Sequence, residues 1–103
     1  MTFEAIRIIR GDHPALPGHF PDAPLVPGVV ILEEVITALS EWRQNAHLNG
    51  VPIVKFLAPL HPEQAFTISF SLRNEHGAEV NFCCRAEERT IVEGQLEVVW
   101  GAE

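Results

Sequence analysis

A histidine and a glutamate, His19 and Glu33, stand fourteen positions apart around a stretch rich in proline and aliphatic residues. Histidine has an unperturbed pKa of roughly 6.5, so its neutral imidazole can accept a proton at physiological pH. A carboxyl group nearby can deliver a proton to a second atom. We therefore interpret the two residues as a candidate base and a candidate acid for proton transfer next to a carbonyl group.

His19 lies in a segment that proline stiffens. Five prolines fall between Asp12 and Pro27, and proline lacks the amide donor and biases its predecessor toward extended geometry. The sequence predicts an ordered loop here, and long loops of this kind are usually functional. A structural or exposed His19 is the alternative, because the chain has five histidines. The other four lack comparable neighbours, and no spacing of metal ligands supports a site built from His13 and His19.

Pro27 and Gly28 mark the predicted start of a helix that runs to about His47. The first amides of a helix lack partners, and the helix dipole attracts negative charge to that end. Gly28 lets a ligand approach the backbone, so Gly28 and Val29 are candidate donors to an oxyanion. Many buried helix starts hold no ligand, so this signal alone does not assign a site.

Glu33 follows one helical turn later, with Val29, Val30 and Ile36 among its neighbours on the helix. A carboxyl group desolvated by such an apolar wall holds its proton more tightly than one in water. The pattern therefore predicts a protonated Glu33 that donates its proton. The alternative is a solvated surface glutamate like Glu34 beside it.

Hydrophobic periodicity predicts the elements that position these residues. A first strand is expected over Phe3–Arg10, and Asn49-Gly50 suits a left-handed cap for the helix. The first helical turn is apolar on all sides, which predicts burial all round. Four further strands are expected in a meander, at 51–57, 66–73, 79–86 and 92–100. This order predicts one α+β domain, residues 1–103, whose antiparallel sheet packs on one helix.

Composition narrows the function classes. The chain has 103 residues, 47% of them hydrophobic and 20% charged, which is typical of one small globular domain that oligomerisation would help to stabilise. A formal charge of −7 argues against nucleic acid or an anionic membrane as the main partner. Without a long apolar run or a leader-like start, the protein is expected to be soluble and cytoplasmic. Cys83 and Cys84 are neighbours, so we expect two reduced thiols on opposite faces of a strand.

The segment from Gly18-His19-Phe20-Pro21 through Pro27-Gly28-Val29 to Glu33 resembles the active-site segment of the hot-dog-fold beta-hydroxyacyl-acyl-carrier-protein dehydratases. In that family the pattern is G-H-F-P-G, a short proline-containing spacer, P-G-V, a few aliphatic residues and an acid, with the same spacing between histidine and acid. Lys55-Phe56-Leu57-Ala58-Pro59-Leu60-His61-Pro62 is similar to the family's K-F-x-x-P-V-x-P. The resemblance covers most of the chain and is specific at residues 18–33.

The resemblance implies a hot-dog fold, in which an antiparallel sheet wraps around one long central helix. It also implies dehydration of a 3-hydroxyacyl thioester, linked to an acyl-carrier protein or to coenzyme A, in fatty-acid, lipid or aryl-polyene type biosynthesis. His19 would remove the C2 proton, the Gly28 amide would hold the thioester oxygen, and Glu33 would protonate the departing hydroxyl. A homodimer would share each site between subunits, without cofactor or metal. Phe20, Pro21 and Pro27 would line the substrate pocket.

The chain departs from the family pattern at several positions. Asp22 replaces a glycine, Glu63 and Gln64 stand where glycine and aspartate are usual, and Thr37 occupies a position that often carries glutamine. Two alternatives therefore remain open. One is a hot-dog acyl thioesterase, and the other is a non-catalytic acyl-binding subunit that keeps the fold.

Overall fold

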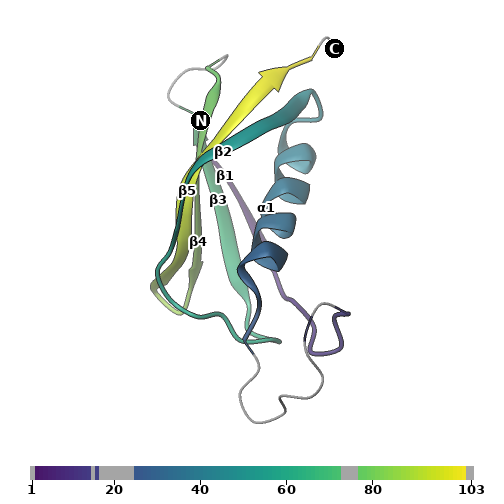
Figure 1. The fold of residues 1–103 in the computed structure, drawn as a ribbon, viewed down its shortest axis with the longest axis vertical. Coiled ribbons are helices and arrows are strands. Elements are labelled where there is room, and N and C mark those ends of the chain that lie inside the picture. Colours follow the sequence, from purple (N-terminus) through teal and green to yellow (C-terminus); the bar gives the residue numbers. More distant parts are fainter. Residues whose placement is uncertain (1, 15, 17–24, 73–76, 102–103) are drawn as a thin grey trace.

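The computed structural model describes residues 2–14, 16, 25–72 and 77–101. One helix and five strands follow one another in the order strand, helix, four strands (Figure 1). This order agrees with the sequence prediction. The elements are β1 (Thr2–Arg7), α1 (Gly28–Trp42), β2 (Ala46–Phe56), β3 (Phe66–Leu72), β4 (Glu79–Ala86) and β5 (Arg89–Trp100).

The five strands form one antiparallel sheet in the order β1-β3-β4-β5-β2, and α1 lies along one face of it (Figure 1). The prediction of a meander is correct for β3, β4 and β5 only. β2 does not pair with β3, which follows it in the chain; it pairs with β5 at the opposite edge. The connection between β2 and β3 therefore crosses the end of the sheet, close to the start of α1 (Figure 1).

Helix α1 is shorter than the sequence predicts. Its last residue is Trp42, and Arg43 is extended, with φ −137° and ψ 101°. The prediction that the helix reaches His47 is wrong because residues from Ala46 onward belong to β2 and pair with β5, beginning with Ala46 opposite Trp100. The proposed Asn49-Gly50 cap instead lies inside β2, where the pairing register shifts. Strand pairing here overrides a local helical pattern.

The core lies between α1 and the sheet. β3 shows the predicted alternation, with every second side chain buried. β1 ends at Arg7 and not at Arg10, although Ile9 is still buried. Phe3, Trp42 and Phe70 stack at the C-terminal end of the helix, with ring centroids 5.4 to 5.9 Å apart. The buried residues of α1 are Val30, Ile31, Val35, Ala38 and Leu39.

The first turn of α1 is buried on one side only. Val30 and Ile31 are buried, whereas Val29 is 61% exposed. Within one chain the prediction of burial all round is therefore wrong, because the sheet covers only the inward face of the helix. In the part of the chain that the structure describes, no helix is long and apolar enough to span a bilayer.

Cys83 and Cys84 lie on opposite faces of β4, as predicted. Both are free thiols, and Cys84 is buried in the core whereas Cys83 is partly exposed. Burial, with a smaller contribution from Cys83, raises the pKa of Cys84 to about 12. The Cys84 thiol is therefore a structural group of the core.

Candidate active site

The start of α1 leaves two backbone donors open. Pro27 is the extended residue before the helix and supplies no side-chain cap. Its carbonyl accepts hydrogen bonds from the amides of Val30 at 3.0 Å and Ile31 at 3.4 Å. Among the described residues, none accepts a hydrogen bond from the amides of Gly28 or Val29. Donors of this kind can bind a developing negative charge, which is the role that the sequence leads us to expect for Gly28 and Val29.

Gly28 is packed against an aromatic ring. A Cβ atom at position 28 would lie 2.5 Å from Cε1 of Phe56, a distance that forces one of them to move. The Phe56 side chain is itself 52% exposed. Sequence reasoning explained Gly28 by ligand approach and assigned no role to Phe56. The K-F pair in the quoted motif was the signal that could have identified this residue.

An apolar cavity of about 500 Å³ opens beside this helix start. Its walls come from two segments, the chain entering α1 and the stretch that follows β2. The amides of Leu57 and Ala58 donate to the carbonyl of Ile91, at 2.8 and 3.3 Å, which fixes the second wall on β5. The cavity can take an aliphatic chain whose polar end lies near the helix start. The described residues that line it are Leu25, Val26, Gly28, Ile31, Phe56, Leu57, Ala58, Pro59 and Leu60.

Glu33 does not line this cavity. Its side chain is exposed on the outer face of α1, between Val29 and Ile36, which are 61% and 38% exposed. These residues are spaced by four and three positions and form one partly apolar stripe on the helix. A single chain therefore does not supply the apolar surroundings that the sequence predicted for Glu33. A second subunit on this stripe would supply them.

The structure places only part of the predicted site. Gly28 lines the cavity, and Pro27 and Val29 are the residues before and after Gly28 in the chain. Glu33 follows about one turn further along α1. His19, Phe20 and Pro21 lie outside the described residues. The roles of all these residues remain predictions.

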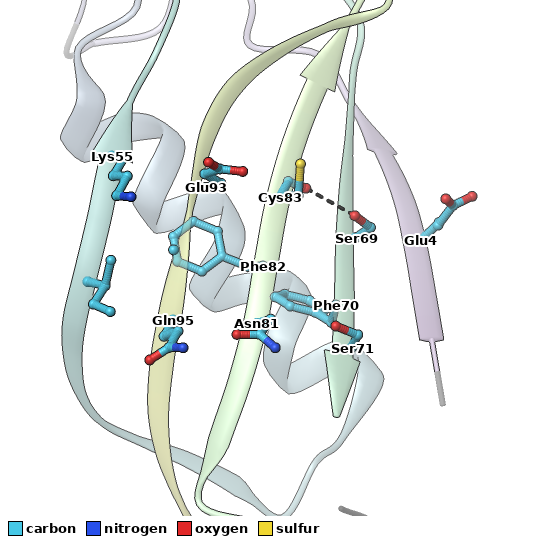
Figure 2. Close-up of a pocket in the computed structure, with 12 residues that line it drawn as sticks. Glu4, Lys55, Ser69, Phe70, Ser71, Asn81, Phe82, Cys83, Glu93 and Gln95 are labelled. Carbon is cyan, nitrogen blue, oxygen red and sulfur yellow. Dashed lines mark hydrogen bonds between the residues drawn. The ribbon is translucent and has the colours of Figure 1, made fainter. Parts of the chain in front are cut away.

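A second cavity, of about 600 Å³, lies on the face of the sheet that α1 does not cover (Figure 2). A polar row crosses all five strands there, and the Ser69 hydroxyl in it donates to the Cys83 carbonyl at 3.3 Å. Of the predicted site residues that the structure describes, none lines this cavity, and the sheet separates it from the helix. The row consists of Glu4, Ser69, Cys83, Glu93 and Lys55, in register from β1 to β2.

Known proteins resemble the chain in sequence and in fold. The 3-hydroxyacyl-[acyl-carrier-protein] dehydratase FabZ of Syntrophobacter fumaroxidans is 26% identical over 102 residues, covering 88% of this chain and 69% of that protein. FabZ of Natranaerobius thermophilus is 31% identical over 83 residues, covering 73% of this chain and 58% of that protein.

Solved structures agree with the predicted fold. The dehydratase heterocomplex ApeI:P from Xenorhabdus doucetiae gives a TM-score of 0.79 at 20% identity, covering 94% of this chain and 86% of the matched chain. Slr0204, a 1,4-dihydroxy-2-naphthoyl-CoA thioesterase from Synechocystis, gives 0.71 at 15% identity, covering 96% and 81%. At such identities the likeness shows the fold alone, and the hot-dog prediction is confirmed.

A family profile decides between the groups of proteins that share this fold. The ApeI-like profile, described as ApeI dehydratase, matches residues 2–95, which is most of the chain. Together with the open helix start and the resemblance of residues 18–33, this match shows that the chain belongs to the ApeI-like dehydratase family.

Proposed function

We propose that this chain, acting as one domain of residues 1–103, dehydrates a 3-hydroxyacyl thioester to the trans-2-enoyl thioester. The observation that carries the proposal is the pair of amides at Gly28 and Val29, for which no described residue supplies an acceptor, together with the place of Gly28 in the wall of an apolar cavity. A thioester carbonyl fits the amides and an acyl chain fits the cavity. Membership of a dehydratase family supports the same reaction.

The proposed reaction begins when the neutral imidazole of His19 removes a proton from C2 of the substrate. The electron pair moves toward the thioester carbonyl, and the Gly28 and Val29 amides stabilise the negative charge that develops on its oxygen. Preorganised donors of this kind contribute about 3 to 4 kcal/mol to a transition state. Protonated Glu33 then donates its proton to the C3 hydroxyl, which leaves as water as the double bond forms. Solvent returns a proton to Glu33 and accepts one from His19.

We propose that the active form is a homodimer in which the α1 helices lie side by side. The exposed stripe of Val29, Glu33 and Ile36 supports this arrangement, because a neighbouring helix would cover two apolar side chains and desolvate the carboxyl group between them. Glu33 is exposed and does not line the cavity of its own chain. Each site would then combine His19 of one subunit with Glu33 of the other.

The carrier of the acyl group is proposed to be an acyl-carrier protein, as the names of the FabZ relatives suggest. Two arginines form ion pairs within the chain: Arg7 pairs with Glu34 and Glu41, and Arg10 pairs with Asp12. Exposed cations remain at Lys55 on β2, Arg85 on β4 and Arg89 on β5. A lower kcat/KM with the coenzyme A thioester than with the carrier-linked substrate is the expected result.

One assay separates the proposal from its two alternatives. The protein is incubated with 3-hydroxyacyl and 2-enoyl thioesters of several chain lengths. Absorbance of the conjugated enoyl group, with hydration in the reverse direction, indicates a dehydratase. Release of free thiol without enoyl product would indicate a thioesterase. Saturable binding without either product would indicate a non-catalytic acyl-binding subunit, and both of these results would overturn the proposal.

A further inference from the structure

The turn at residues 61–64, before β3, carries a glutamate in a left-handed backbone conformation. Glu63 has a φ of 67°, a region in which non-glycine residues are strained. The side chain and the backbone of Gln64 both form hydrogen bonds with His61 across the turn. The His61 amide donates to Gln64 Oε1 at 3.1 Å, and the Gln64 amide donates to the His61 carbonyl at 3.3 Å. The Glu63 carboxylate takes part in neither of these bonds.

The Glu63 carboxylate instead binds a distant part of the chain. Its Oε2 accepts a hydrogen bond from the Gly11 amide. The Glu63 amide donates to the Ile9 carbonyl at 2.8 Å. Glu63 therefore holds the chain just before residues 12–25 by one side-chain bond and one backbone bond.

The same segment also holds the chain just after residues 12–25. The Val26 amide donates to the Leu60 carbonyl at 2.9 Å, and both of these side chains are buried. Gly28, at the open helix start, follows two residues later. Residues 60–63 thus connect the two described ends of the stretch in which His19 lies.

Glycine would adopt a φ of 67° without strain, and the dehydratase pattern has glycine at this position. Glycine, however, offers no carboxylate to the Gly11 amide. This chain therefore accepts backbone strain at Glu63 and gains a charge-assisted hydrogen bond between two segments. Backbone strain that a side-chain contact compensates is typical of a position under functional constraint.

We propose that Glu63 is a positioning residue for the dehydratase reaction. Through Gly11 it fixes the start of the His19 segment relative to Gly28. This inference rests on the role proposed above for His19. The alternative is that Glu63 contributes to folding stability only.

Three substitutions at Glu63 separate these roles. Glu63→Ala removes the hydrogen bond to Gly11 and keeps the backbone strain, whereas Glu63→Gly removes both. The melting temperature of Glu63→Gly should therefore lie roughly 4 to 8 °C above that of Glu63→Ala. Glu63→Gln keeps an acceptor oxygen. A positioning role predicts that kcat falls roughly tenfold in both Glu63→Ala and Glu63→Gly, with KM nearly unchanged, and stays close to the wild-type value in Glu63→Gln.

Asp12→Ala provides the matched control. Asp12 lies one residue beyond Gly11, and its one ion pair within the described part of the chain is an exposed contact with Arg10 at 3.2 Å. Its kcat should equal that of the wild type. If Glu63→Gly retains wild-type kcat while Glu63→Ala loses activity, activity follows stability and the proposal is overturned.

A second measurement does not depend on turnover. The imidazole signals of His19 are identified in NMR spectra by their loss in His19→Ala. They should shift in Glu63→Ala and Glu63→Gly and stay in place in Asp12→Ala. Unshifted signals in Glu63→Gly would overturn the positioning role whatever the assays show. A wild-type protein that dehydrates no thioester, but whose His19 signals shift as expected, would overturn the dehydratase proposal alone.

Discussion

The ring of Phe56 occupies the space beside Gly28 that a side chain at position 28 would need, since a Cβ there would lie 2.5 Å from Cε1 of the ring. The contact joins the open end of α1 to the end of β2, and it forms part of the cavity wall. Phe56 is partly exposed, so its ring can turn away into solvent.

Gly28→Ala should therefore fold but lose activity. The new methyl group pushes the Phe56 ring out of its place and narrows the approach to the Gly28 amide. We expect the free energy of unfolding to fall by about 1 kcal/mol and kcat/KM to fall roughly tenfold or more. Thermal denaturation and the enoyl absorbance assay measure the two effects.

The double variant Gly28→Ala with Phe56→Leu is the control for the steric explanation. A smaller and more flexible side chain at position 56 makes room for the methyl group, so stability should return toward that of Phe56→Leu alone. A double variant whose losses equal the sum of the two single losses would show that the Phe56 ring is not what Gly28 accommodates.

Gly94 on β5 has a different reason to be glycine. A Cβ at this position would lie 2.1 Å from the backbone carbonyl oxygen of Ile53 and 3.0 Å from the Phe82 ring. A backbone oxygen cannot turn away as a side chain does. Gly94→Ala should therefore displace β2 and destabilise the protein by about 3 kcal/mol or more, measured by urea denaturation.

Gly50 in β2 is the matched control, because no atom lies within 4 Å of the position of its Cβ. Gly50→Ala should change the free energy of unfolding by less than about 1 kcal/mol. Equal destabilisation by the two substitutions would refute the steric account of Gly94.

Cys84 should make the stability of the fold depend on pH in the alkaline range. Burial raises the pKa of its thiol from 9.0 to about 12 in the folded chain. A raised pKa means that the contribution of the protonated thiol is complete below pH 9 and is lost as the pH rises toward 12. At pH 10 the loss should be about 1 kcal/mol relative to pH 8.

The measurement is the difference in unfolding free energy between the wild type and Cys84→Ala. This difference should shrink between pH 8 and pH 10, because only the wild type carries the buried thiol. A difference for Cys84 that is constant with pH would contradict its burial as a neutral thiol.

The strands that the sequence placed best are those with strict alternation. β3 begins at Phe66 and alternates as predicted, because one buried face imposes a period of two on its side chains. Its predicted last residue, Arg73, lies outside the described residues. The helix end was misplaced because Ala46 continues the helical spacing of Leu39 and Trp42. Its burial in fact comes from pairing opposite Trp100. A local pattern contains no information about a partner fifty-four positions away.

The same limit applies to the candidate site. The missing side chain of Gly28 pointed to the helix start, because the freedom of approach that glycine allows is a local property. Phe56 was overlooked because its contact with Gly28 depends on β2 lying at the edge of the sheet, beyond β5. The exposure of Glu33 agrees with the alternative that the sequence left open, a solvated surface glutamate. Periodicity could not decide between the two, since it does not reveal which side of a helix a single sheet leaves uncovered.

Glu33 provides the sharpest test of the shared site. Its side chain is exposed on α1 of a single chain. The free energy of unfolding of a Glu33→Ala monomer should therefore lie within about 0.5 kcal/mol of the wild-type value. Dehydration should nevertheless be abolished, as it should be in His19→Ala, because each variant lacks one of the two proton-transfer groups. Ser40→Ala, about two turns along on the exposed side of the same helix, is the control that should keep activity.

Mixing the two inactive variants then tests whether one site uses two subunits. When His19→Ala and Glu33→Ala are unfolded together and refolded, half of the dimers should be mixed. Each mixed dimer contains one site with both groups intact, so about one quarter of the wild-type activity should return. Two variants that stay inactive after mixing, although native mass spectrometry shows mixed dimers, would mean that His19 and Glu33 act within the same chain.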